Sequence, residues 1–111
     1  MKKKIVSAVI LCRIGSSRLK DKLFLKINNK TVLDTFIDKI LNIKEINEVV
    51  LATTRNKIDD KIELLAKKKS IKYFRGSEKN VLSRIKNSIK VFDQKPTYII
   101  RANSDNPMIS P

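Results

Sequence analysis

The stretch Ile5-Val6-Ser7-Ala8-Val9-Ile10-Leu11 decides the fold class, because it is an almost continuous apolar run near the start of the chain. Such a run is typical of a strand that is buried on both faces of a parallel sheet. Three further strand-like runs follow, at residues 48–53, 71–74 and 97–100. The sequence therefore predicts a sheet with four strands.

Segments with helical spacing of apolar residues separate these strands. The first is predicted at 31–41, where Thr31 and Asp34 have the spacing of a capping box. The second begins at Asp59 and ends in the lysine run 67–69, which we interpret as a solvated helix end. The third is predicted over 81–92.

This alternation predicts an α/β fold with a three-layer Rossmann-like parallel sheet of order 3-2-1-4, in which residues 1–111 make up at most one domain. In that order the carboxyl ends of the first and fourth strands are neighbours. Ligands bind at such a switch point in open α/β sheets. The residues after these two strands are therefore expected to carry the chemistry.

The segment 13–22, which follows the first strand, combines cations, hydroxyls and a glycine. Arginine and lysine neutralise phosphate charge, hydroxyls and amides donate hydrogen bonds, and glycine lets the backbone approach the ligand. The spacing matches neither a Walker loop nor a dinucleotide fingerprint. The segment predicts a polyphosphate site, with a solvated basic loop as the alternative.

Composition narrows the possible chemistry. The chain has 111 residues, no histidine and a single cysteine, Cys12, so serine–histidine and cysteine–histidine catalysis are excluded. We interpret Cys12 as a small buried residue at a strand end. The net charge of +14 is compatible with nucleic-acid binding, but lysine supplies most of the 25 cations and the aromatic residues are few. We therefore expect no nucleic-acid partner, no membrane association and a cytoplasmic location.

Motifs in four parts of the chain resemble those of the cytidylyltransferases that activate acidic sugars, and most closely the spore-coat polysaccharide biosynthesis protein F branch. The first is Arg13-x-x-Ser16-Ser17-Arg18-Leu19-x-x-Lys22 and the second is Leu51-Ala52-Thr53-Thr54. The third is Phe74-Arg75-Gly76-Ser77-Glu78 with Val81, Leu82 and Arg84, and the last is the segment 101–109. Arg84 is equally compatible with an ion pair on an amphipathic helix.

The resemblance implies magnesium-dependent nucleotidyl transfer from CTP to a sugar acid, giving a CMP-sugar and pyrophosphate, on a glycosyltransferase-A-like sheet. By matching positions, the nucleotide would be bound by Arg13, Gly15, Ser16, Ser17, Arg18, Lys22, Arg75 and Asn103, and Mg²⁺ by Asp105. Arg13, Lys22 and Asp105 would be the catalytic residues.

Members of this family continue well beyond the position that matches Pro111. We therefore expect the sugar-binding part to be absent and residues 1–111 to bind nucleotide without turnover. The full-length protein is expected to form a homodimer. The alternatives from other classes are a basic nucleic-acid-binding module and a non-catalytic α/β domain that pairs with a partner chain.

Overall fold

The computed structural model describes residues 4–13, 26–27 and 30–103. The elements in chain order are β1 (Val6–Leu11), β2 (Lys26–Ile27), β3 (Lys30–Thr31), α2 (Val32–Leu41), β4 (Glu48–Thr54), the 3-10 helix η1 (Lys57–Asp59), α3 (Asp60–Lys68), β5 (Lys72–Gly76), α4 (Val81–Ser88), the 3-10 helix η2 (Ile89–Val91) and β6 (Tyr98–Asn103). The predicted strands and helices are all present. The hairpin of β2 and β3 was not predicted.

The main sheet has four strands in the order β5-β4-β1-β6, which confirms the predicted order 3-2-1-4. All of its pairings are parallel. In the register, Leu11 at the end of β1 lies beside Ala52 of β4 on one side and Asn103 of β6 on the other. The carboxyl ends of β1 and β6 are therefore neighbours, as expected.

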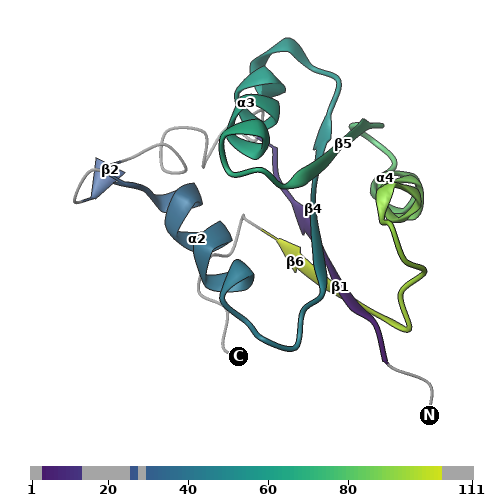
Figure 1. Ribbon diagram of the computed structural model, residues 1–111. Coiled ribbons are helices and arrows are strands. Elements are labelled where there is room, and N and C mark those ends of the chain that lie inside the picture. Colours follow the sequence, from purple (N-terminus) through teal and green to yellow (C-terminus); the bar gives the residue numbers. More distant parts are fainter. Residues whose placement is uncertain (1–3, 14–25, 28–29, 104–111) are drawn as a thin grey trace.

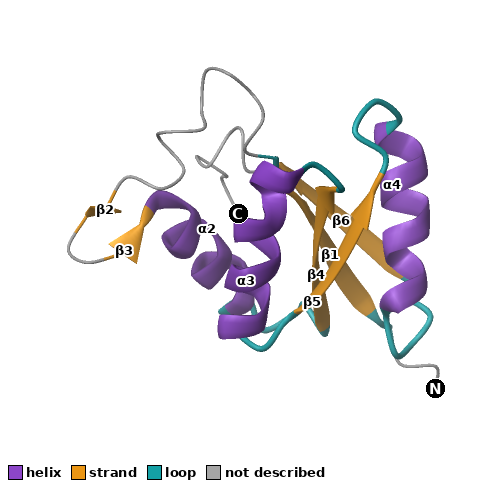
Figure 2. Cartoon of the chain, turned by 90° about the horizontal axis from the view of Figure 1, so that it is seen from above, coloured by secondary structure: helices purple, strands orange, loops and turns teal. Residues whose placement is uncertain are grey.

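Helices cover both faces of this sheet. Figure 2 shows α2 and α3 on one face and α4 on the other. Successive residues of β1 point to opposite faces of the sheet. Ala8 and Ile10 pack in the core under α2 and α3, and Val9 and Leu11 pack in the core under α4. Both faces of β1 are thus buried, which is the physical reason for its uninterrupted apolar run.

Helix α2 begins with the predicted capping box. The Thr31 hydroxyl accepts a hydrogen bond from the Asp34 backbone N–H, and the Asp34 carboxylate accepts one from the Thr31 backbone N–H. Lys69, which follows α3, forms ion pairs with Asp34 at 3.1 Å and with Asp38 at 2.9 Å. The interpretation of 67–69 as a solvated helix end was therefore wrong for Lys69, which ties α3 to α2.

Strand β6 forms one edge of the described sheet (Figure 1). Its apolar side chains Tyr98, Ile99 and Ile100 are 54%, 42% and 43% exposed. No helix in the described part of the chain is long and apolar enough to cross a membrane.

Candidate functional site

A pocket of about 490 Å³ lies where the ends of β1 and β6 meet the start of α4. Its lining residues are Leu11, Cys12, Arg13, Glu78, Lys79, Val81, Arg84 and Arg101. This is the carboxyl edge of the parallel sheet, at the point where the strand order reverses. The pocket therefore occupies the position at which open α/β sheets bind ligands.

The sheet register brings the strand-borne residues of the pocket together. Arg101 of β6 lies beside Val9 of β1, so both side chains point to the face of the sheet that α4 covers. Arg13 follows β1 directly and lines the same pocket. Residues that are far apart in the sequence thus reach one cavity because two parallel strands end side by side.

Arg84 enters the pocket from the inner face of α4. Only 4% of the residue is exposed, so a charged group is nearly excluded from water. Its Nη1 donates to the Ser77 carbonyl oxygen at 2.9 Å, whereas its buried Nε has no hydrogen-bond partner among the described residues. A buried, unpaired donor of this kind costs free energy unless a ligand or water completes it.

Gly76 makes room for the stem of Arg84. A Cβ atom at Gly76 would lie 3.3 Å from Cγ of Arg84 and 2.6 Å from Cε2 of Phe74. The second distance is below any normal van der Waals contact. A side chain at position 76 would therefore displace the Phe74 ring, the Arg84 stem or both.

The pocket is strongly cationic. Its lining contains Arg13, Arg84, Arg101 and Lys79, against one carboxylate, Glu78. Glu78 accepts from Nη1 of Arg13 at 3.4 Å, but both side chains are more than one-third exposed, so the pair contributes little stability. Burial lowers the pKa of Arg84, and the positive charges of Arg13 and Arg101 lower it further, although Asp59 and Cys12 act in the opposite direction. The arrangement favours an anionic ligand.

Cys12 is 1% exposed at the end of β1, which confirms its interpretation as a small buried residue. Among the predicted site residues, Arg13 lines the pocket. Asn103 is the last residue of β6, where its backbone lies beside Leu11. The predicted residues Gly15, Ser16, Ser17, Arg18, Lys22 and Asp105 lie outside the described residues.

Arg75 lies at the end of β5 and is not among the residues that line the pocket. Its Nε donates to the Thr54 carbonyl at 2.8 Å and its Nη2 to the Asn56 carbonyl at 2.7 Å. Its Nη1 pairs with Asp60 at 2.6 Å and with Glu63 at 3.3 Å. The hydrogen bond to Asp60 raises the pKa of Arg75, although burial opposes the shift. In this structure Arg75 joins the end of β4 to the start of α3.

Arg84 and Arg101 were not among the predicted site residues. Arg84 lies three residues after Val81, at the spacing of the inward face of α4. Arg101 interrupts the apolar run of β6 at a position whose side chain shares a face with Val9. Two signals were available: both arginines lie in the motifs quoted above, and Arg84 stands at a helical position where a core residue is expected.

The described residues contain no group of three or more histidine, cysteine, aspartate or glutamate side chains that could hold a metal ion. The one carboxylate that lines the pocket, Glu78, is paired with Arg13. The described part of the pocket therefore does not by itself fit a metal ion. Phosphate oxygens and a carboxylate outside the described residues would have to supply the ligands.

The α/β fold with a parallel sheet of this order resembles the structures of nucleotidyltransferases. The profile of the cytidylyltransferase family matches residues 7–111. The chain belongs to the cytidylyltransferase family, as its motifs predicted.

Individual relatives agree with this assignment. The chain is 33% identical over 108 residues to the spore coat polysaccharide biosynthesis protein SpsF of Bacillus subtilis, covering 93% of this chain and 44% of that protein. A cytidylyltransferase structure from Leptospira borgpetersenii superimposes with a TM-score of 0.84 at 32% identity, covering 97% of this chain and 44% of that one.

A more distant structure shares the fold. The CMP:2-keto-3-deoxy-manno-octonic acid synthetase, solved in complex with CTP, gives a TM-score of 0.70 at 24% identity, covering 97% of this chain and 43% of that one. The chain thus spans less than half the length of each of these relatives.

Proposed function

We propose that the protein takes part in nucleotidyl transfer from CTP to a sugar acid, giving a CMP-sugar and pyrophosphate for polysaccharide synthesis. One observation carries the proposal: Arg13 of the first family motif and Arg101 of the last line one cationic pocket at the carboxyl edge of the sheet. Family membership of residues 7–111 supplies the class of reaction. We place the reaction in the cytoplasm.

In the proposed reaction, a hydroxyl oxygen of the sugar acid forms a bond to the α-phosphorus of CTP. The bond from that phosphorus to the bridging oxygen breaks, pyrophosphate leaves with the electron pair, and the hydroxyl proton is released. Catalysis of this kind depends on positioning and on neutralising the phosphate charge. This requirement suits a chain without histidine.

We assign the triphosphate to Arg13, Gly15, Ser16, Ser17, Arg18 and Lys22, and the base to Asn103 and Arg75. For Arg75 this role would require that it exchange some of its contacts with Asp60 and Glu63 for contacts with the nucleotide. Asp105 would hold Mg²⁺, which would neutralise phosphate charge when bound. Because the chain spans less than half the length of its relatives, we expect these residues alone to show no turnover, and we propose that the sugar-acid site and a homodimer contact need the rest of that length.

The test is a calorimetric titration of the 111-residue chain with CTP, UTP, ATP and GTP in the presence of Mg²⁺. We expect CTP to bind most tightly and Arg13→Gln to weaken CTP binding about tenfold, because an arginine–phosphate hydrogen bond is charge-assisted. Lys86→Gln is the matched control, since it removes one exposed cation from α4. Equal binding of all four nucleotides, or no binding of CTP, would refute the cytidine assignment.

A further inference from the structure

Two arginines outside the predicted phosphate-binding loop add positive charge to the pocket. The loop 13–22 already supplies four cations by sequence, and Arg84 and Arg101 come from different parts of the chain. Each adds a guanidinium to the α4 side of the pocket, opposite a single carboxylate. Like charges in a shared, partly buried site repel unless an anion lies between them.

The Arg84 side chain is fixed in position but keeps one unpaired donor, as expected of a residue that binds a ligand. Its stem packs over Gly76, and Nη1 is fixed by the Ser77 carbonyl, so the orientation of the guanidinium is set before a ligand arrives. The buried Nε still lacks an acceptor in the described structure. A purely structural arginine would be expected to satisfy this donor, as Arg75 does with the Thr54 carbonyl.

Arg101 supplies the second guanidinium from the sheet. It is exposed, and it forms no ion pair with any of the described residues. Because its register position puts it on the α4 face, its charge lies close enough to lower the pKa of Arg84. An oxyanion between the two would accept hydrogen bonds from both and relieve their repulsion.

We propose that Arg84 and Arg101 form an oxyanion subsite on the α4 side of the pocket, in addition to the loop that holds the nucleotide triphosphate. The ligand is a phosphate or a carboxylate group. Its source is either the nucleotide or the sugar acid, and to that extent the inference rests on the proposed function. The subsite itself requires only an oxyanion, whichever base the nucleotide carries.

The experiment measures binding of pyrophosphate, CTP and glucuronate to the 111-residue chain by calorimetry, for the parent, Arg101→Gln, Arg84→Gln and the matched control Lys86→Gln. We expect at least one of these ligands to bind, and to bind about tenfold more weakly to both arginine variants, because each loses a charge-assisted hydrogen bond. Lys86→Gln should stay within about twofold of the parent, since it removes an equal charge outside the pocket.

The source of the oxyanion follows from which ligand responds. Weakened pyrophosphate and CTP binding identifies a nucleotide phosphate, and weakened glucuronate binding identifies a sugar carboxylate. Arginine variants that match Lys86→Gln for every ligand would overturn the subsite. If all four nucleotides bind equally yet all depend on Arg101, the cytidine assignment fails and the subsite stands.

A second measurement does not depend on whether the Arg84 variant folds. In the unaltered chain, the ¹H–¹⁵N resonance of the Arg84 Nε–H should shift downfield when pyrophosphate or glucuronate saturates the site, because that donor gains an acceptor. A resonance that stays in place at saturation would contradict the proposal.

Discussion

Two arginines on either side of the same sheet have opposite surroundings. Arg75 donates to two backbone carbonyls and pairs with two carboxylates, so its charge is matched within the fold. Arg84 is more deeply buried, faces two further arginines and leaves Nε without a partner among the described residues. The pKa of Arg75 is raised by its partners, whereas burial and like charge lower that of Arg84.

The difference separates a structural role from a binding role. A cation that is paired with carboxylates and backbone carbonyls, as Arg75 is, stabilises the fold without a ligand, whereas a desolvated cation with an unpaired donor gains stability when an anion binds. Neighbouring residues of β5 contact the two different sites. Arg75 pairs with Glu63 of α3, and Gly76 lies against the stem of Arg84 of α4. Three substitutions test this contrast.

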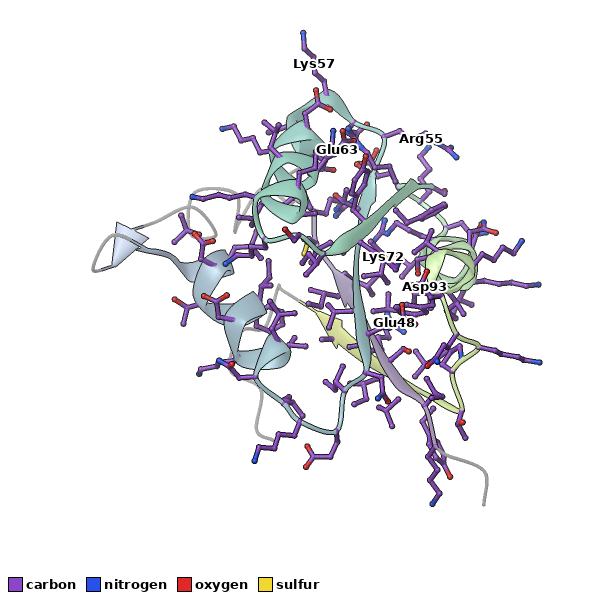
Figure 3. All side chains as sticks on the ribbon, viewed as in Figure 1. Glu48, Arg55, Lys57, Glu63, Lys72 and Asp93 are labelled. Carbon is purple, nitrogen blue, oxygen red and sulfur yellow. The ribbon has the colours of Figure 1, made fainter. Side chains whose placement is uncertain are left out.

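The largest effect is expected for Arg75→Gln. The change strands the Thr54 and Asn56 carbonyls and leaves Asp60 and Glu63 without their shared cation, so we expect a loss of about 2 kcal/mol in the free energy of unfolding. Urea denaturation measures it. The control is Arg55→Gln, because Figure 3 shows the Arg55 side chain directed away from the fold near the end of β4.

Equal stability of Arg75→Gln and Arg55→Gln would remove the distinction between the two arginines. Arg75 would then be free to leave its partners at low cost, which would strengthen its assignment to the nucleotide base.

Gly76→Ala should have the next largest effect. The added Cβ would lie 2.6 Å from the Phe74 ring and 3.3 Å from the Arg84 stem, so overpacking should destabilise the fold by about 1–2 kcal/mol. Displacement of the Arg84 stem should also weaken binding of pyrophosphate or glucuronate, depending on which of the two the unaltered chain binds. Ala66→Gly, made in the core of α3 on the opposite face, controls for stability loss alone. Weakened binding in both variants would show that Gly76 has no special relation to Arg84.

The smallest effect concerns acid stability. A hydrogen bond from Lys67, with a second from Arg75, lowers the pKa of Glu63 below 4.5, although burial opposes the shift. Glu63 therefore contributes stability above the unfolded pKa, and that contribution is lost as the pH falls through the lower, folded value. Figure 3 shows Glu63 on α3 beside β4 and β5, within this cluster.

Glu63→Gln should accordingly flatten the acid limb of a plot of unfolding free energy against pH. Glu45→Gln, which removes an exposed carboxylate outside the cluster, should keep the slope of the parent. An unchanged slope in Glu63→Gln would mean that the hydrogen bonds from Lys67 and Arg75 do not stabilise the ionised Glu63 carboxylate in the folded protein.

The central strands β1 and β4 could be predicted from sequence because they are buried on both faces and therefore contain long apolar runs. The edge strands β5 and β6 are less buried, and they were predicted from shorter apolar stretches between helical segments. The ends of elements were less certain: β6 continues to Asn103 and β5 to Gly76, beyond the apolar stretches that marked them. The hairpin of β2 and β3 has two residues in each strand, too few to give a periodic signal. Lys69 pairs with α2 through tertiary contacts that its local sequence does not encode.

The site was harder to predict for a similar reason. Arg13 follows β1, a strand buried on both faces, and polar residues at the end of such a strand already indicate a ligand site. Arg84 has the same spacing as core residues of α4, and only the packing against Gly76 and Ser77 shows that its charge is buried rather than solvated. The sequence predicted that Arg84 lies on a helix, but it could not predict that its guanidinium is buried.

The central position of β1 has a consequence for how the protein folds. Its partner β6 is the last strand described, and their pairing joins residues that are about 92 positions apart in the chain. Contacts at such separation close late and make folding slow. The cavity between Arg13 and Arg101 should therefore be among the last features to assemble during refolding, after the β1–β4–β5 half has formed.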